Sequence, residues 1–307
     1  MIVSWVVRPK QIAREMGWHL AILLVWDFFV VIAEMVLHWN WVSWPDVPLA
    51  LYGAAIGLLV SFRNASTYNR WWEARTLWGA IVNKSRTFAR QVLNTMSAPK
   101  DSDGAEQQEA EVLRRRLVTY QIAYVHALRQ QLRGLDPVAE VARVLPDEDW
   151  SGLAGEKNAA LAIQRRMGDM LTAARHRGWI SEWEWQAIDD SLEGLMDAQG
   201  GAERINNTPM PKQYDFLAWF FVLIYCVILP VGIVERLGWF TPLGSTIVGF
   251  MFMALDKIGR DLEDPFDNSI YDVPLTAITT TIEINLRQLL GEKELPAPMK
   301  PVEGVLW

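Results

Sequence analysis

The stretch from Val47 to Trp78 constrains the fold of this chain more than any other. Its first part, Val47 to Phe62, is apolar and carries no charged side chain, whereas from Arg63 onward it is rich in arginine and tryptophan. Both parts have the composition of a helix. The stretch therefore predicts one continuous helix that leaves a membrane near Phe62 and enters water.

Composition agrees with a chain that is partly in a membrane and partly in water. The 307 residues are 51% hydrophobic with a mean hydropathy of +0.07, between the values typical of soluble and of fully membrane-embedded proteins. The formal net charge of -7 argues against a nucleic-acid partner, which requires a basic surface. Cys226 is the only cysteine, which excludes an internal disulfide and a cysteine-based metal site.

Charge placement around the first two apolar runs predicts their orientation. Met1 to Met16 is amphipathic and basic, with Arg8, Lys10 and Arg14, and a first span of about 18–37 follows it. The next segment, HWNWVSWPD, holds three tryptophans and no lysine or arginine, which is typical of the interface away from the cytoplasm. A second span of about 47–62 then returns to an arginine-rich segment. Both flanks of this pair of spans are expected in the cytoplasm.

Asp27 and Glu34 interrupt the first span and lie seven residues apart, hence on one helical face. Acids at membrane depth need a partner or water. One interpretation makes them part of an ion pathway. The other, which is the more common situation, has them facing neighbouring helices or lipid headgroups.

The middle of the chain predicts a helical region in water. Helix-length periodic runs occur at Glu106 to Arg133 and Asn158 to Arg177, and loop residues gather at Ala98 to Gly104 and Asp136 to Gly155. No alternating strand pattern bounded by hairpin turns is found.

Two more apolar runs follow, at about Phe216 to Val234, which contains Pro230, and at about Leu243 to Leu255, which is short for a span. We therefore expect an all-α membrane protein with four transmembrane helices and a large cytoplasmic helical bundle. The expected regions are 1–62 with the first two spans, 63–213 in the cytoplasm, 214–255 with the last two spans, and 256–307 as a cytoplasmic helix and tail.

Enzyme motifs are missing from the sequence. It has no phosphate-binding loop, no nucleophile elbow and no zinc-protease pair, and its four histidines are widely scattered. We expect neither catalysis nor a cofactor.

Ala54, Leu58 and Phe62 follow one another at four-residue spacing in the second span, so they share a helical face. Such a face suits an apolar constriction. Ordinary packing is the more common explanation of such a stripe, because apolar stripes are frequent in membrane helices, and Gly53 and Gly57 form a small-residue contact motif on an adjacent face.

Two widely separated groups of residues resemble the signatures of the bestrophin family, specifically its bacterial branch. The first group is Ser61-Phe62-Arg63-Asn64, Tyr68, Arg70-Trp71-Trp72-Glu73-Ala74-Arg75 and Leu77-Trp78-Gly79. The second is Glu263-Asp264-Pro265-Phe266, Asp272-Val273-Pro274-Leu275 and Thr281-Ile282-Glu283-Ile284-Asn285-Leu286-Arg287. Only Asp101 to Asn158 lacks family landmarks.

The resemblance implies a homopentameric ion channel with one axial pore, a neck formed by the second helix and a cytoplasmic vestibule. Carried over by position, the neck residues are Ala54, Leu58 and Phe62. The family's neck is usually made of three bulky apolar residues, so Ala54 departs from it and that end is expected to be wider. Trp183 is the candidate for a second, cytoplasmic aperture.

The other signature residues are expected to be structural: Arg63, Asn64, Arg70, Trp71, Trp72, Glu73, Asp264, Pro265 and Phe266. Calcium-gated relatives carry a dense acidic run after this proline and phenylalanine. Here only Asp267 and Asp272 remain as weak metal-ligand candidates, too few for a hard cation, so we expect no metal site and no gating by calcium.

The leading hypothesis is a passive channel for small monovalent ions in a bacterial inner membrane, with both termini cytoplasmic and with other copies of the chain and the lipid bilayer as its partners. Ion sign stays open: the acidic segment Asp256 to Trp307 favours cations weakly, and chloride is the other candidate. The alternative hypothesis is a membrane-anchored helical scaffold or sensor that transports nothing.

Overall fold

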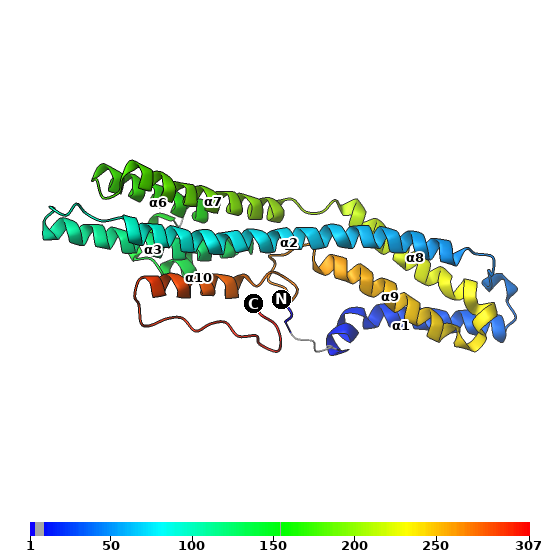
Figure 1. Cartoon of the computed structure of the whole chain (residues 1–307). Coiled ribbons are helices and arrows are strands. Elements are labelled where there is room, and N and C mark those ends of the chain that lie inside the picture. The colour runs from blue at the N-terminus through cyan, green and yellow to red at the C-terminus, as the bar shows by residue number, and fades with distance from the viewer. Residues whose placement is uncertain (4–8, 154) are drawn as a thin grey trace. The chain divides into compact units, whose positions relative to one another are not determined.

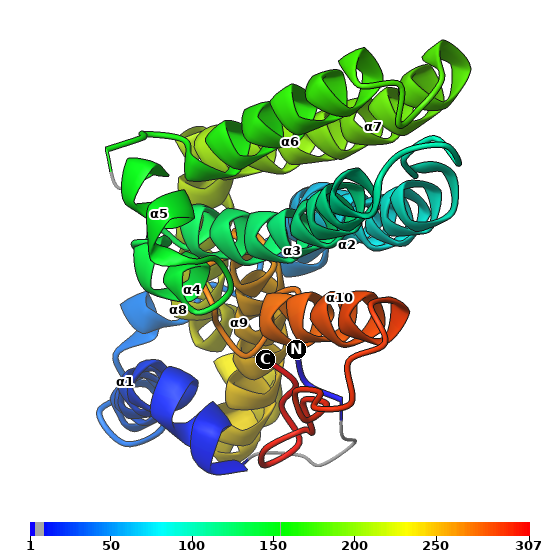
Figure 2. The same cartoon turned by 90° about the vertical axis from the view of Figure 1, so that its left-hand side faces the viewer.

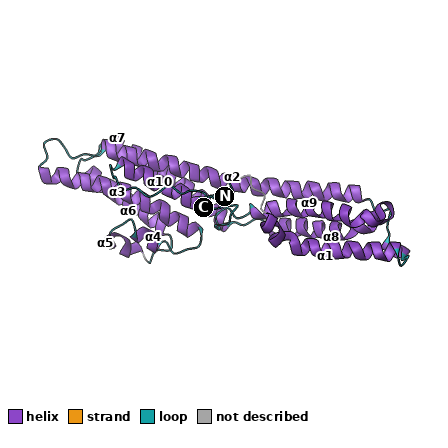
Figure 3. Ribbon diagram, turned by 90° about the horizontal axis from the view of Figure 1, so that it is seen from below, coloured by secondary structure: helices purple, strands orange, loops and turns teal. Residues whose placement is uncertain are grey.

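The computed structural model describes residues 1–3, 9–153 and 155–307, and regular secondary structure in these ranges is entirely helical (Figure 3). Its α-helices are α1 (Pro9–Met35), α2 (Leu49–Thr95), α3 (Gly104–Leu132), α4 (Val138–Ala142), α5 (Asp147–Trp150), α6 (Ala159–His176), α7 (Glu182–Asn207), α8 (Lys212–Leu237), α9 (Thr241–Asp261) and α10 (Leu275–Leu289). Short 3-10 helices are η1 (Asn40–Val42), η2 (Ser151–Leu153) and η3 (Gly238–Phe240). The all-α prediction is confirmed for these residues.

The chain forms two compact units. We call the first the bundle unit; it comprises 72–208 and 265–307, together with the first residues of the chain. The second, which we call the apolar unit, comprises α1, α2 as far as Trp71, and Pro209–Asp264. Helix α2 contributes to both units, and Figure 1 shows it as one unbroken helix. The continuous helix predicted from Val47 to Trp78 is therefore present as the first part of α2.

In the apolar unit, α1, α8 and α9 pack against one another. Leu23, Val60, Ala218, Val222 and Cys226 form a buried cluster among α1, α2 and α8. Burial of such side chains contributes about 1.5–3 kcal/mol each in a water-facing core, but inside lipid the stabilisation comes mainly from close packing.

Three stretches of the described residues are long and apolar enough to cross a membrane: Arg14–Met35, Leu49–Thr95 and Lys212–Asp261. The third contains both α8 and α9. Helix α9 is longer than the predicted run of Leu243 to Leu255, and an ion pair between Lys257 and Asp261 adds to the stability of its last turn. Arg8 and the side chain of Lys10, both expected in a basic amino-terminal segment, lie outside the described residues.

Asp27 is fully buried between α1 and α9. The hydroxyls of Ser245 and Thr246 donate hydrogen bonds to its two carboxylate oxygens at 3.0 and 3.2 Å. The interpretation of Asp27 as a residue that faces a neighbouring helix is thereby confirmed.

The bundle unit is organised around α3, which packs against α6, α7 and α10. In Figure 2, α3 lies between the pair α6 and α7 on one side and α10 on the other. Side chains cap the helix starts: Asp103 accepts from the backbone of Glu106, and Ser181 forms a reciprocal capping box with Glu184. The predicted helices at 106–133 and 158–177 correspond to α3 and α6.

The loop predicted from Asp136 to Gly155 is wrong in part, because α4, α5 and η2 lie within it. Pro137 stands directly before α4 and its carbonyl accepts from the backbone N–H of Val141, so this proline begins a helix. Val141, Leu145 and Leu153 are buried and hold the short turns against the bundle.

Candidate functional site

The three candidate neck residues, Ala54, Leu58 and Phe62, lie on one exposed face of α2. Leu58 is 59% exposed and Phe62 is 61% exposed. In the apolar window of α2 only 11% of residues are buried, against 33% and 44% in the other two candidate spans. Most of this apolar face of α2 is therefore exposed in the described part of a single chain.

Other faces of the same segment make close contacts. Val60 is buried, and a Cβ atom at Gly53 would lie 2.9 Å from the hydroxyl oxygen of Tyr225 on α8. The small-residue motif thus allows close packing at Gly53, whereas a Cβ at Gly57 would meet no atom of the described residues within 4 Å. Packing and an exposed apolar face coexist on different sides of α2.

The exposed face continues along α2 beyond Phe62 with a change of chemistry. Asn69, Thr76 and Asn83 follow Phe62 at intervals of seven residues, which places them on nearly the same face, and all three are exposed. Sequence reasoning missed these residues. The seven-residue spacing from Phe62 is the signal that identifies them.

Arg63 is buried beside this face and holds α2 to α9 and α8. Its Nη1 lies 2.6 Å from Oδ1 of Asp256 and 3.2 Å from Oδ1 of Asp215, and its Nη2 donates to the backbone carbonyl of Asp256. The Asn64 amide donates to the carbonyl of Leu255 at 2.8 Å. Both side chains of the Arg63–Asp256 pair are only 2% exposed, and their opposite charges compensate each other.

A further ion pair and a glycine keep the junction of α2 and α9 compact. Arg260 lies 2.7 Å from the other oxygen of Asp256, so that carboxylate contacts two guanidinium groups. Gly259 has no side chain where α2 approaches, and a Cβ there would collide with the side chains of Arg63 and Asn64. Glycine at this position permits the close approach.

Arg70 contacts the segment that follows α9. Its Nε donates to the carbonyl of Glu263 at 2.7 Å, and its Nη2 lies 4.0 Å from Oδ1 of Asp264. Tyr68 and Trp71 stack one turn apart, with ring centroids 6.4 Å from each other. Residues of the two signature groups, nearly two hundred positions apart in the sequence, are therefore in direct contact.

The remaining signature residues lie in the bundle unit. Trp72 is 55% exposed, Glu73 forms an ion pair with Arg204, and Phe266 is buried. Pro265 accepts a hydrogen bond from the backbone N–H of Val273 at 3.1 Å.

The weak metal-ligand candidates are Asp267, which is exposed, and Asp272, which is buried. The carboxylate of Asp272 accepts hydrogen bonds from the backbone N–H and the hydroxyl of Ser269. Among the described residues, no group of three or more histidine, cysteine, aspartate or glutamate side chains is arranged to hold a metal ion.

Trp183 lies in the first turn of α7 and is 82% exposed. Nothing in the isolated chain assigns it to an aperture, so that role stays a prediction.

Sequence reasoning also missed a buried polar cluster in the bundle unit. His126 on α3 lies with its Nε2 2.8 Å from Oε2 of Glu283 on α10, and the same oxygen contacts Arg143 at 2.8 Å. The sequence did not reveal this cluster, because the histidines are far apart and the partner of His126 is a carboxylate on another helix. The one signal in the sequence was that Glu283 belongs to the second signature group.

The electrostatics of this cluster favour an ionised carboxylate and a neutral imidazole. Burial alone would raise the pKa of Glu283, but hydrogen bonds from His126 and Arg143 outweigh burial and hold that pKa well below its ordinary range. Burial lowers the pKa of His126 more than its contact with Glu283 raises it. Nδ1 of His126 has no hydrogen-bond partner among the described residues. This agrees with a neutral imidazole, because a protonated ring would need an acceptor at Nδ1.

Comparison with known proteins gives consistent matches along the chain. A family model described as bacterial/fungal bestrophin protein matches residues 5–288. A voltage-dependent anion channel-forming protein of Mesorhizobium japonicum is 35% identical over 83% of this chain and 78% of its own length. A protein of the same name from Escherichia coli O157:H7 is 33% identical over 96% of this chain and 97% of its own.

Among solved structures, a bacterial bestrophin homologue from Klebsiella pneumoniae superposes with a TM-score of 0.83 at 29% sequence identity. The match covers 91% of this chain and 100% of the Klebsiella chain.

Proposed function

The chain belongs to the bacterial and fungal bestrophin family, and from that premise we propose that it is a passive ion channel in which several copies surround one axial pore. The names of the relatives support a channel. We further propose five copies, with the exposed face of α2 from each copy directed at the axis.

The observation that carries this proposal is the apolar face of α2. A large exposed apolar surface marks a contact with lipid, with another protein or with a pore. On α2 that surface includes Ala54, Leu58 and Phe62 on one helical face, and the polar residues Asn69 and Thr76 follow them along the helix. An apolar neck that opens into a polar vestibule has this order of residues.

The proposed arrangement in the membrane has four crossings, by α1, the first part of α2, α8 and α9, with both termini in the cytoplasm of a bacterial cell and the inner membrane as the location. Residues 1–62 and 214–255 then supply the crossings, whereas 63–213 and 256–307 are cytoplasmic. Arginines after Phe62 and the tryptophan-rich segment around η1, which has no lysine or arginine, support this orientation.

The neck acts through dehydration in this mechanism. A ring of Leu58 side chains and a ring of Phe62 side chains exclude water, and an ion that enters must shed hydration without gaining polar partners. Widening or wetting of the rings opens the pore. Asn69 and Thr76 offer amide and hydroxyl groups to an ion that leaves the neck, which lowers the cost of rehydration.

We propose that small monovalent ions pass through the pore. Two observations disagree on whether these ions are anions or cations. The relatives' names support anions. The acidic composition after Asp256 favoured cations, but Asp261 is paired with Lys257 and Glu283 with Arg143, so the free acidic charge is smaller than composition indicates. Anions are therefore the first class to test, and the reversal potential under a salt gradient decides between the two.

The alternative hypothesis is a membrane-anchored scaffold or sensor. An experiment with purified protein reconstituted in sealed vesicles, across which a potassium chloride gradient is imposed, distinguishes this hypothesis from a channel. A channel collapses the gradient, and a permeant-ion substitution series then identifies the conducted ion. Vesicles that hold the gradient as well as protein-free vesicles, with the protein shown to be inserted and assembled, would favour the scaffold.

A further inference from the structure

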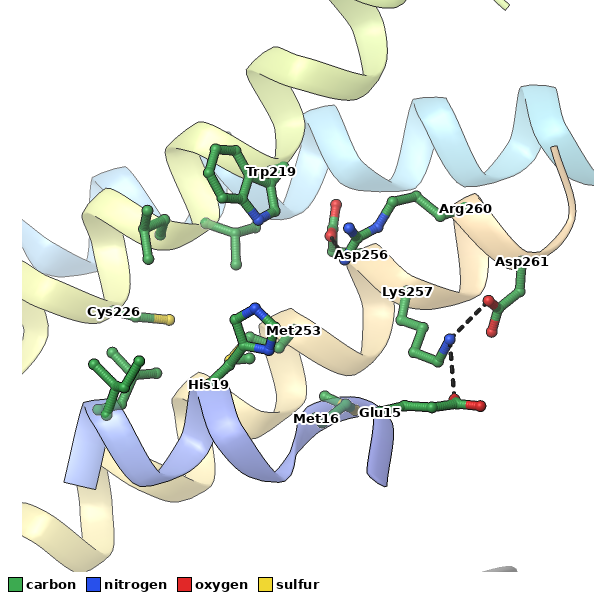
Figure 4. A pocket seen from close by; sticks show the side chains of 14 residues that line it. Glu15, Met16, His19, Trp219, Cys226, Met253, Asp256, Lys257, Arg260 and Asp261 are labelled. Atoms are coloured by element: carbon green, nitrogen blue, oxygen red, sulfur yellow. Dashed lines mark hydrogen bonds and ion pairs between the residues drawn. The ribbon is translucent and has the colours of Figure 1, made fainter. Parts of the chain in front are cut away.

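A cavity of about 360 Å³ lies within the apolar unit, bounded by α1, α8 and α9 (Figure 4). It is placed where α1 and α8 begin and α9 ends, because residues near those ends line it: Glu15, Trp219 and Lys257. A volume of this size is within the range of small-molecule binding sites, about 300–1,000 Å³. Nothing in the proposed conduction mechanism uses it.

One half of the cavity is lined by charged groups of both signs. Lys257 Nζ lies 3.0 Å from a carboxylate oxygen of Glu15 and 2.8 Å from one of Asp261, as Figure 4 shows. Arg260 contacts Asp256, whose carboxylate is shared with the buried Arg63. Acidic and basic groups nearly balance, which suits a ligand that carries both charges better than a simple anion.

These charged groups remain accessible. The side chains of Glu15, Lys257 and Asp261 are 23%, 25% and 19% exposed, so a ligand can reach them without unfolding a helix. His19 also lines the cavity, beside Met253 in Figure 4, and adds a further polar group.

The other half is apolar and opens toward the outer surface of the helices. Leu23, Val222 and Met253 line it, together with Ile22 and Leu223, which are 50% and 40% exposed. The apolar lining therefore runs without interruption onto the face that would meet lipid tails. Trp219 borders the cavity, and tryptophan side chains are enriched at the level of lipid headgroups.

We propose that this cavity binds a zwitterionic glycerophospholipid of the cytoplasmic leaflet, of the ethanolamine class. The phosphate contacts Arg260 and Lys257, the ammonium group contacts Glu15 and Asp261, and one acyl chain follows the apolar half past Leu223. A purely anionic headgroup that engaged Lys257 would supply no positive charge to Glu15 and Asp261, the two carboxylates that Lys257 contacts. The proposal depends on insertion of the apolar unit in a membrane, and it does not depend on channel activity.

The test is native mass spectrometry of the intact purified assembly with phosphatidylethanolamine, phosphatidylglycerol or phosphatidylcholine added separately. The assembly should retain phosphatidylethanolamine at a concentration about tenfold lower than either of the others, which is the selectivity of one well-placed charged contact. Glu15→Gln should remove most of this preference, because it removes a carboxylate that contacts the ammonium group. Glu182→Gln, the matched control at the start of α7 and outside the cavity, should leave the preference unchanged.

Leu223→Trp provides a second variant that changes no charge. The larger side chain fills the apolar half and should reduce retention of phosphatidylethanolamine at least several-fold, while assembly mass and melting temperature stay at the parent values. Equal retention of the three lipids by the parent overturns the proposal. So does a preference that survives both variants, or a cavity that binds lipid only after the assembly dissociates, since a second copy of the chain then covers it.

Discussion

Arg63 stands at the residue where α2 changes from apolar to polar, and its charge is compensated by Asp256 within the same unit. Without Asp256, Arg63 keeps its contact with the partly exposed Asp215 but loses its buried partner, and breaking a buried pair typically costs about 3–5 kcal/mol. Asp256→Ala should therefore lower the melting temperature of the solubilised protein strongly or prevent its assembly.

Asp264→Ala is the matched control for that change. Asp264 also faces a signature arginine, but it is 55% exposed and 4.0 Å from the guanidinium of Arg70, and exposed pairs of this kind contribute about 0–1 kcal/mol. Comparable melting temperatures for the two variants would show that the Arg63–Asp256 pair does not hold this junction.

His126 and Glu283 make the stability of the bundle unit depend on pH. Because burial holds the pKa of His126 below its ordinary value of 6.5, the unfolded chain binds a proton there before the folded chain does, and stability falls as the pH drops below about 6.5. The pKa of Glu283 is also lowered when folded, so its contribution is lost below its ordinary value of 4.5. Both groups therefore make the folded protein less stable as the pH falls.

We predict that the melting temperature falls steadily between pH 7.5 and pH 5, and that His126→Gln reduces this slope. His176→Gln is the control, since His176 lies at the end of α6 and outside the cluster. Equal slopes for the parent and His126→Gln would mean that the imidazole is not the group responsible.

At the scale of elements, the long helix α2 was predictable because its signal is local. An apolar run followed by an arginine- and tryptophan-rich run of helical composition needs no knowledge of distant contacts. The same holds for α3 and α6, whose periodic runs and capping residues are adjacent in the sequence.

Elements and contacts that depend on distant residues were not predictable. The short helices α4 and α5 exist because Val141 and Leu145 are buried against the bundle, and a local reading of Pro137 and Pro146 indicated only a loop. Likewise, the pairing of His126 with Glu283 joins residues 157 positions apart. Sequence reasoning placed Ala54, Leu58 and Phe62 on one helical face and identified both signature groups, but the contacts of the signature residues required the fold.

A substitution at Ala54 tests which face of α2 lines the pore. It is already small and exposed, so enlarging it to leucine adds apolar bulk without removing any packing contact. If its face lines the pore, Ala54→Leu should reduce ion flux in vesicles severalfold. Ala21→Leu, the matched control, enlarges an exposed alanine of α1 and should leave flux at the parent value. Equal flux for the two variants and the parent would place the pore elsewhere.

At the scale of the whole molecule, one chain does not enclose a pore in the proposed account, since α2 is the only helix assigned a lining face. Several copies must surround an axis, and we predict five. Native mass spectrometry in mild detergent should give about 175 kDa, five times the 35.0 kDa of one chain. A stable monomer or dimer would remove the channel proposal together with the pentamer.

The central claim is that Leu58 and Phe62 form the barrier to ions, and flux through Phe62→Ala compared with Phe28→Ala tests it most directly. Phe28 is an exposed phenylalanine of α1, so the two variants lose the same side chain at different places. In assembled protein, Phe62→Ala should raise the rate of gradient collapse at least severalfold because water enters the widened ring, and Phe28→Ala should match the parent. Unchanged or reduced flux in Phe62→Ala, with the parent conducting, would contradict the account.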